Sequence, residues 1–135
     1  MNISESLRRQ VINLANYQCE YCLIHESDTY FGCEIDHIIS VKHGGTSIPE
    51  NLAYACMTCN RFKGSDLGSI TDDGTLVRFY NPKTDIWREH FSIQNNEIIP
   101  LTAIGAVTAR IFRFNDFARK AERETLQELG LYPKI

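Results

Sequence analysis

Apolar residues near the N-terminus recur at helical spacing. Leu7, Val11 and Leu14 lie three or four positions apart, and Ser4 precedes them. Serine is a residue type that caps helix N-termini, because its side chain accepts a hydrogen bond from an unpaired backbone N–H. The pattern predicts a helix over residues 5–16.

The middle of the chain has shorter apolar segments that are typical of strands. Residues 30–39 are rich in β-forming types and alternate roughly between apolar and polar. The turn-forming residues 49–51 precede the short apolar segment 52–55, and residues 59–65 can form a short helix. We therefore expect a strand, a long loop, a second strand and a helix, in that order.

The remaining residues predict hairpins followed by two helices. A turn-forming Asp-Gly pair precedes a strand expected over residues 75–80, and residues 91–99 are expected to form a hairpin. Thr102 and Asn115 are residue types that can cap two helices, the second of which should end near Gly130. No internal repeat, low-complexity segment or clear linker divides the sequence.

Composition and charge restrict the function classes only slightly. Hydrophobic residues make up 43% of the chain and charged residues 23%, which is ordinary for a globular protein. The net charge of −3 argues against binding nucleic acid through the overall field, so local basic groups and bound metal would have to supply such affinity. The first residues lack the pattern of a signal peptide, and no apolar run approaches the length of a membrane span. We therefore expect a cytoplasmic protein.

Four cysteines form two closely spaced pairs. Cys19 and Cys22 are one Cys-x-x-Cys pair, and Cys56 and Cys59 are another. Each pair places two thiols on one tight turn, and two such pairs supply the tetrahedral four-thiolate set of a structural Zn²⁺ site. Two disulfides are the alternative, which an intracellular location disfavours.

Two other residues with ligand atoms lie near these cysteines. Cys33 lies in an apolar segment, so we expect it to be a small buried residue and not a ligand. His25 follows the first pair and could replace one cysteine, although four good ligands already exist.

Acidic, imidazole and amide side chains lie within and beside the cysteine frame. Asp36 is a hard oxygen ligand suited to Mg²⁺ or Mn²⁺, and the adjacent His37 can take a proton from water near neutral pH. Asn51 can hold a histidine ring by hydrogen bonding, and the amide oxygen of Asn60 can be a second metal ligand. Each has an ordinary alternative: Asp36 and His37 could form a surface ion pair, Asn51 could be a turn former, and Asn60 could be a helix cap.

Taken together, these motifs resemble the HNH endonuclease family. The matching residues follow the family's order and spacing: Cys19-x-x-Cys22, Glu34-Ile35-Asp36-His37-Ile38-Ile39, His43-Gly44-Gly45, Asn51-Leu52 and Cys56-x-x-Cys59-Asn60-x-x-Lys63-Gly64. They cover residues 19–64, and five linked pieces make the resemblance specific. One departure is Asn60, because many members have histidine there.

The resemblance implies a fold and a chemistry. The expected fold is α+β, with a ββα-metal core at about residues 17–66 stapled by the four-cysteine zinc site. An N-terminal helix and an extension at about 67–135, made of hairpins and two helices, would complete one domain over residues 1–135. The resemblance implies that His37 is the general base, that Asp36 and Asn60 bind catalytic Mg²⁺ or Mn²⁺, and that Asn51 orients His37. The implied activity is hydrolysis of DNA phosphodiester bonds.

Basic residues near the motifs are the expected nucleic-acid contacts. Arg61 and Lys63 lie beside the site, and Lys63 is favoured because it falls within the motif. Other basic residues could extend the contact with the nucleic-acid backbone, although an ordinary charged helix face explains them equally well. These residues are Arg110, Arg113, Arg119, Lys120 and Arg123. A homodimer would be one way to cut both strands.

Three other functions stay open at this point, of which a purely structural role, with zinc for folding only, is the weakest. A non-catalytic zinc module that binds nucleic acid or protein would need the cysteines but would have no use for Asp36 and His37. An RNA-directed nuclease would use the same residues as a DNA-directed one.

Overall fold

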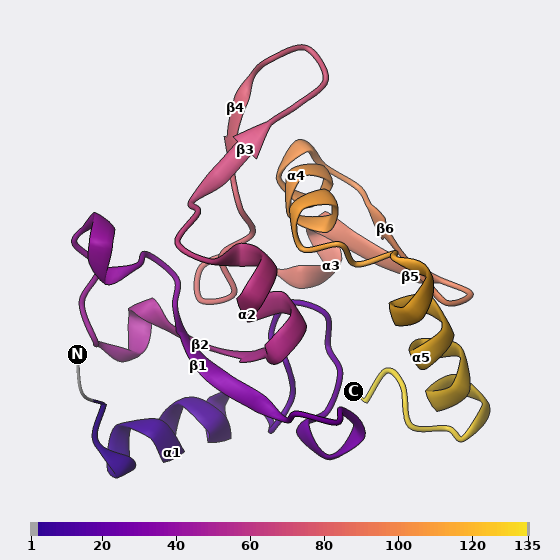
Figure 1. Cartoon of the computed structure of the whole chain (residues 1–135), viewed down its shortest axis with the longest axis horizontal. Helices are drawn as coiled ribbons and strands as arrows, with labels where there is room; N and C mark the ends of the chain where they lie inside the picture. The colour runs from indigo at the N-terminus through magenta and orange to yellow at the C-terminus, as the bar shows by residue number, and fades with distance from the viewer. Residues whose placement is uncertain (1–2, 135) are drawn as a thin grey trace. The chain divides into compact units, whose positions relative to one another are not determined.

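In the computed structural model, which describes residues 3–134, the chain divides after Asp66 into two units (Figure 1). We call residues 1–66 unit 1 and residues 67–135 unit 2. The helices and strands of unit 1 are α1 (Glu5–Leu14), β1 (Cys33–His37), β2 (Leu52–Cys56) and α2 (Met57–Lys63). Its short 3-10 turns are η1 (Glu26–Asp28), η2 (Val41–His43) and η3 (Pro49–Asn51).

Helix α1 begins where the sequence predicts and ends earlier than expected. The Ser4 hydroxyl accepts a hydrogen bond from the backbone N–H of Leu7 at 3.1 Å, which confirms the expected N-cap. The helix stops at Leu14 because Asn16 and Tyr17 have positive φ angles of 55° and 61°, which a right-handed helix cannot contain.

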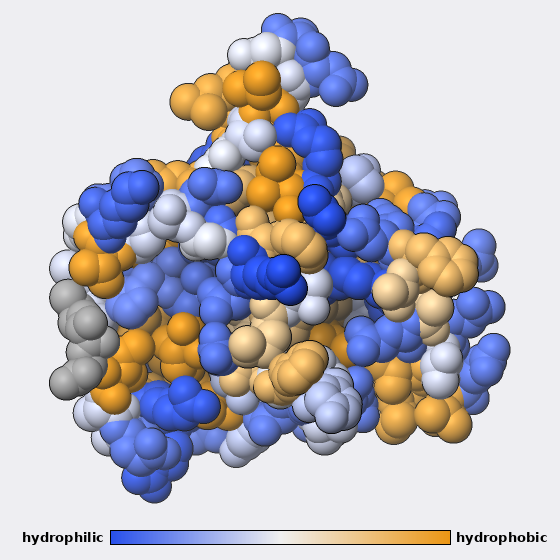
Figure 2. All heavy atoms as spheres, in the orientation of Figure 1, coloured by the Kyte–Doolittle hydropathy of each residue, from blue (hydrophilic) through white to orange (hydrophobic). Residues whose placement is uncertain are grey.

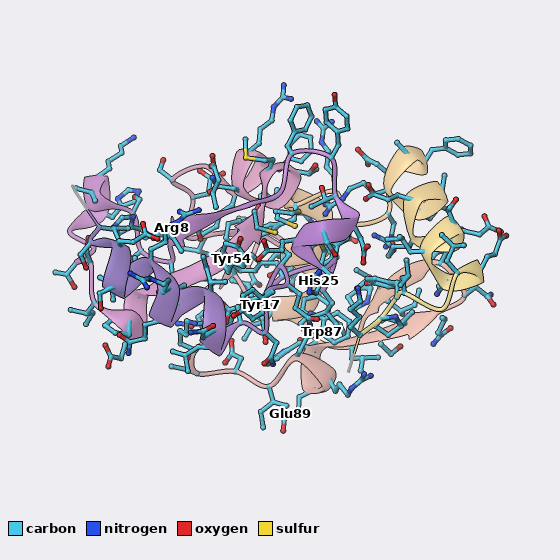
Figure 3. The ribbon with its side chains drawn as sticks, turned by 90° about the horizontal axis from the view of Figure 1, so that it is seen from below. Arg8, Tyr17, His25, Tyr54, Trp87 and Glu89 are labelled. Carbon is cyan, nitrogen blue, oxygen red and sulfur yellow. The ribbon has the colours of Figure 1, made fainter. Side chains whose placement is uncertain are left out.

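Strands β1 and β2 form an antiparallel pair that lies between the two helices of unit 1 (Figure 1). β2 is buried along its whole length, because α1 packs against it and α2 packs against both strands. Arg8 of α1 lies near Tyr54 of β2 (Figure 3); burial raises the pKa of Tyr54 to about 12, and the Arg8 charge opposes this only weakly. β1 starts at Cys33, later than predicted, since Gly32 before it has a left-handed φ of 71°.

Helix α2 grows out of the second cysteine pair. The Cys56 sulfur accepts a hydrogen bond from the backbone N–H of Cys59 at 3.4 Å, so a thiol occupies the N-cap position. This cap lets the helix begin at Met57, before its predicted start. The helix ends at Lys63, and Gly64 follows with a φ of 54°.

The described residues of unit 2 form two hairpins, one short helix and two longer helices. They are β3 (Gly68–Ile70), β4 (Leu76–Arg78), α3 (Trp87–His90), β5 (Phe91–Gln94), β6 (Glu97–Pro100), α4 (Ala103–Ile111) and α5 (Phe117–Glu128). The predicted strand at 75–80 is confirmed as the shorter β4, and the predicted hairpin at 91–99 as β5 and β6. Apolar side chains are visible on the β3–β4 hairpin (Figure 2), where Ile70 and Leu76 are exposed. The hairpin is supported by α4, which packs against both of its strands.

The core of unit 2 is aromatic. Phe91 is buried, and its ring centroid lies 5.0 Å from that of Trp87. Glu89, on the same short helix as Trp87, points outward (Figure 3). A β-carbon at Gly105 would lie 2.3 Å from the carbonyl oxygen of His90, so only glycine permits the close approach of α4 at this point.

The two long helices of unit 2 are capped differently. The Thr102 hydroxyl accepts a hydrogen bond from the backbone N–H three residues later at 3.0 Å, as predicted. Asp116, and not the predicted Asn115, occupies the N-cap position of α5. The Asn115 side chain instead accepts from the Ile98 N–H at 2.9 Å and donates to the Ile98 carbonyl at 2.8 Å. Gly130 lies just past α5 with a φ of 71°, which confirms the predicted helix end.

The described residues confirm the α+β class. Helices are combined with two-stranded antiparallel sheets, and β1, β2 and α2 follow one another in the predicted ββα order. The organisation as one domain, with a core at about 17–66 and an extension at about 67–135, stays a prediction. Between residues 3 and 134, no helix has both the length and the apolar character that crossing a membrane requires.

Candidate functional site

The thiols of the two cysteine pairs meet in one buried cluster. The sulfur atoms of Cys19, Cys22, Cys56 and Cys59 all lie within 4.8 Å of one another, and those of Cys22 and Cys56 are 3.7 Å apart. Four sulfurs around one Zn²⁺ at about 2.3 Å would be separated by about 3.8 Å. The cluster therefore has the spacing of a site for a single metal ion, as its sequence pattern predicts.

The chemistry of this cluster fits a soft cation. All five cysteines lie among the described residues and are thiols, so the disulfide alternative does not hold. Burial raises the pKa of the Cys19 and Cys59 thiols, which means that ionised thiolates here need a compensating positive charge. Sulfur ligands favour Zn²⁺ over Mg²⁺ or Ca²⁺. Cys33 is buried in β1 outside the cluster, and the His25 ring bonds to the Ser27 hydroxyl at 2.7 Å.

The cysteine cluster joins the elements that carry the candidate catalytic residues. Glu20 lies inside the first pair, and its carboxylate accepts a hydrogen bond from the backbone N–H of Tyr54 in β2 at 2.7 Å. The backbone N–H of Glu20 donates to the Tyr54 carbonyl at 2.8 Å. The second pair forms the start of α2. A metal ion in the cluster would therefore tie the turn at residues 19–22 to β2 and α2.

Asp36 of β1 is held by two partners that come from these elements. The residue is 5% exposed, which makes its charge costly unless it is paired. Its Oδ2 accepts a hydrogen bond from the Tyr21 hydroxyl at 2.9 Å, and its Oδ1 accepts one from the Lys63 ammonium at 3.2 Å. Burial raises the pKa of Asp36, while the Lys63 charge and the hydrogen bond from Tyr21 act in the opposite direction. Both partners are anchored next to the cysteines.

A second acid shares this face of β1. Glu34 lies two positions before Asp36, so the two side chains point to the same side of the strand. The Glu34 carboxylate accepts a hydrogen bond from the amide nitrogen of Asn60 at 2.9 Å. Asn60 and Lys63 are three residues apart on α2, which places them on one face of the helix, toward the two acids. Sequence reasoning missed Glu34, although its spacing from Asp36 is the signal of a shared face.

The side chains on this face carry oxygen atoms of the type that binds hard divalent cations. Carboxylates and amide oxygens are the ligands that Mg²⁺ and Mn²⁺ prefer, and Glu34, Asp36 and Asn60 supply them from two adjacent elements. Asn60 uses its amide nitrogen on Glu34, so its amide oxygen is the atom that remains for a cation. Lys63 is an internal positive charge that already contacts Asp36.

His37 lies next to Asp36 in sequence but on the other side of the strand. β1 pairs with β2 residue for residue as far as His37, so consecutive side chains point to opposite faces. His37 is the last residue of β1 and is half-buried. Its Nε2 lies 2.9 Å from the Ser47 hydroxyl, and its carbonyl accepts a hydrogen bond from Lys63 at 2.9 Å.

Asn51 acts on the loop after β1. Its Oδ1 accepts a hydrogen bond from the backbone N–H of Ile39 at 2.8 Å, and its Nδ2 donates to the carbonyls of Ile39 and Thr46, both at 2.9 Å. The contact with the His37 ring that was expected of Asn51 is made by Ser47, the residue after Thr46. Asn51 therefore acts through the loop that carries Ser47, and no sequence motif pointed to Ser47.

The comparison with protein families identifies the segment that holds this arrangement. Residues 19–66 match the family model of the HNH endonuclease. This HNH segment contains the cysteine cluster, both strands, α2, and the predicted residues Asp36, His37, Asn51 and Asn60. At the level of the family, the match indicates a nuclease-type function for this segment and nucleic acid as the substrate class. No curated protein and no solved structure matches the chain.

The two basic residues of α2 within the HNH segment have different surroundings. Arg61 is exposed, with its guanidinium 6.0 Å from the centroid of the Phe62 ring. Lys63 is 2% exposed and its ammonium is directed at Asp36, so it does not lie where a phosphate would contact it. This position corrects the expectation for Lys63, because pairing with a buried acid decides where its charge lies. The phosphate contact of Arg61 stays a prediction.

Outside the HNH segment, two arginines of the wider footprint are buried in unit 2. Arg119 donates a hydrogen bond to the Phe112 carbonyl at 2.7 Å, and Arg123 donates one to the Phe114 carbonyl at 2.6 Å. Both guanidinium groups satisfy carbonyl groups that follow α4. Their role is therefore structural, and these two residues do not support the wider phosphate footprint, which the sequence did not favour.

Proposed function

We propose that the chain is a metal-dependent HNH endonuclease that hydrolyses DNA phosphodiester bonds. The observation that carries the proposal is the position of α2. Its first turn belongs to the cysteine cluster, and the residue after Cys59 is Asn60, which contacts the acidic face of β1. One short helix thus connects the cysteine cluster to the oxygen-bearing side chains of β1. His37 is the last residue of that strand.

The cysteine cluster is proposed to hold a structural Zn²⁺. Four thiolates complete a tetrahedral coordination, so no position stays open for water and the zinc takes no part in the reaction. Its contribution would be to fix Tyr21 and the start of α2, and it is Tyr21 and the last residue of this helix, Lys63, that hold Asp36.

A catalytic Mg²⁺ or Mn²⁺ is proposed to bind to Asp36 and Asn60, with Glu34 as a third oxygen donor. When bound, such an ion neutralises negative charge that develops on the phosphate. Tyr21 and Lys63 hold the Asp36 carboxylate from two elements, which fixes its orientation.

His37 is proposed to be the general base. Asp36 and His37 point to opposite sides of β1, so the proposal requires one phosphate to bind at the His37 end of the strand, within reach of both side chains. The water oxygen bonds to phosphorus, one water proton passes to His37 and then to solvent, and the bond to the 3′ oxygen breaks. That oxygen takes up a proton, which gives 5′-phosphate and 3′-hydroxyl ends.

The first test is plasmid nicking in Mg²⁺ or Mn²⁺. The wild type should relax supercoiled plasmid, and His37→Ala should be at least about 100-fold slower because it lacks the base. His43→Ala is the matched control, since His43 is an exposed histidine in the loop after β1. Equal rates for the wild type and His37→Ala, at equal zinc content, would overturn the proposed function.

A non-catalytic zinc module is the second candidate. One observation favours it: Lys63 already supplies Asp36 with a buried positive charge, so this carboxylate is neutralised without a divalent ion. Such a protein would bind nucleic acid in a gel-shift assay but leave it intact in both metals. Incubating the protein with a matched single-stranded RNA in both metals, and looking for cleavage, separates a DNA-directed from an RNA-directed nuclease.

A homodimer stays a prediction that light scattering on and off DNA would test.

A further inference from the structure

The loop between β1 and β2 brings a hydroxyl group to the proposed base. Ser47 lies 10 residues after His37 in the sequence, yet its Oγ is 2.9 Å from Nε2 of the ring. Both side chains are half-buried. The Ser47 hydroxyl can accept from a protonated Nε2 or donate to an unprotonated one, so the direction of this hydrogen bond and the tautomer of the neutral ring are linked.

The loop that carries Ser47 is tightly fixed. Asn51 reaches across it and bonds to Ile39 on one side and to Thr46 on the other. Gly45 packs so closely that a β-carbon there would lie 1.6 Å from the Ile39 carbonyl oxygen. The backbone N–H of Gly45 also donates to the Ser40 carbonyl at 3.0 Å. Ser47 therefore meets the ring from a rigid support.

The backbone of His37 is fixed from the other direction. The Lys63 ammonium donates a hydrogen bond to the His37 carbonyl at 2.9 Å. The next residue, Ile38, donates its backbone N–H to the Asn51 carbonyl at 2.9 Å. With the backbone held and Nε2 engaged by Ser47, the ring has one remaining nitrogen, Nδ1, for another partner.

We propose that Ser47 is a positioning residue that sets the tautomer of His37. A base needs its lone pair on the nitrogen that Ser47 does not engage, which is Nδ1, so we assign the Ser47 hydroxyl as the acceptor of a hydrogen bond from Nε2–H. Nδ1 is then the atom that takes the proton from water. The inference rests on the proposed function for the role of that proton, while the tautomer itself is a property of the folded chain.

The test is NMR of the zinc-loaded chain labelled with ¹⁵N in histidine. Spectra are recorded at rising pH until they stop changing, and His37→Ala identifies the His37 signals. The wild type should show protonated Nε2 and unprotonated Nδ1. In Ser47→Ala the two tautomers should mix, and Ser47→Thr, which keeps a hydroxyl, should restore the wild-type pattern. A wild-type ring protonated on Nδ1, or the same tautomer in Ser47→Ala, would overturn the inference.

A matched control lies in the same loop. The Ser40 hydroxyl is buried and has no hydrogen-bond partner among the residues that the structure describes. Ser40→Ala therefore removes the same group without touching the ring, and it should leave the tautomer unchanged. A change in Ser40→Ala as large as in Ser47→Ala would mean that the loop as a whole, and not the Ser47 hydroxyl, sets the ring.

Kinetics separate this inference from the proposed function. If the chain cleaves plasmid, Ser47→Ala should lower kcat by about tenfold with KM unchanged, because only part of the general-base contribution is lost. Ser47→Thr should restore kcat. A wild type that has the Nε2–H tautomer but does not cleave would refute the proposed function and support the assigned tautomer. A cleaving wild type with an unchanged tautomer in Ser47→Ala would refute the inference alone.

Discussion

At the scale of single residues, the two cations of α2 should have separate effects on stability. Lys63→Met would leave the Asp36 carboxylate buried without its charged partner, and breaking a buried pair in this way costs about 3 kcal/mol or more. Arg61→Met removes an exposed charge from the same helix, so the free energy of unfolding should change by less than about 0.5 kcal/mol. Urea denaturation of the two zinc-loaded variants measures both values.

DNA binding should rank these variants in the reverse order. Arg61→Met should weaken binding to all sequences alike and reduce the slope of log K against log salt by about one. Lys63→Met should leave that slope unchanged, because its ammonium faces Asp36 and not the surface. Equal losses of stability, or a smaller salt slope in Lys63→Met, would contradict the buried pair.

Residue identities in the candidate site were predictable only where local spacing carries the information. The cysteine pairs are such a case, since two thiols on one turn point to a common ion. The side of β1 on which Glu34 lies also follows from strand alternation. The burial of Lys63 does not, because lysine is ordinarily exposed. The contact of Ser47 with His37 depends on how a long loop closes, which no local pattern encodes.

At the scale of elements, the Arg78–Asp85 pair links β4 to the turn before α3. The hydrogen bond from Arg78 lowers the pKa of Asp85, and the backbone N–H of Asn81 acts in the same direction. A depressed folded-state pKa means that the Asp85 contribution is present above the unfolded pKa, about 3.9, and is lost as pH falls through the folded pKa. The stability of the wild type should therefore fall over this acidic range because of Asp85.

Asp85→Asn removes this contribution. Above about pH 5 the variant should be less stable than the wild type by a constant amount below about 1 kcal/mol, because Arg78 is half-exposed. The two should converge as pH falls below the unfolded pKa. Thermal unfolding from neutral to acidic pH measures the difference in stability between the wild type and Asp85→Asn. A difference that grows toward low pH would refute the stabilising pair.

Element boundaries can be predicted from the sequence where a side chain forms a hydrogen bond with the backbone of the element beside it. Ser4 and Thr102 cap the helices that they precede, and both were predicted correctly. Asn115 was predicted wrongly because its amide pairs with the backbone of Ile98, which lies 17 residues away. The strand β3 was missed for a related reason: Gly68 to Ile70 has little strand pattern of its own and forms only by pairing with β4.

At the scale of the whole molecule, the two units rely on different cores. Unit 1 places its four clustered thiols among its most buried groups, whereas unit 2 packs buried aromatic rings against one another. Structural zinc contributes on the order of 10 kcal/mol in small metal-stabilised domains, which matches or exceeds the entire stability of a typical domain. Metal removal should therefore act on unit 1 far more than on unit 2.

Hydrogen exchange with and without a strong chelator tests this expectation. Chelation should abolish protection of backbone amides in β2 and α2, while those of β6 and α4 stay protected, because their hydrogen bonds depend on the aromatic core. Cys59→Ser should lose its zinc and reproduce the pattern, whereas Cys33→Ser, which changes a buried thiol outside the cluster, should keep one zinc. Equal loss of protection in both units would show that unit 2 also depends on the metal, as a single cooperative domain would require.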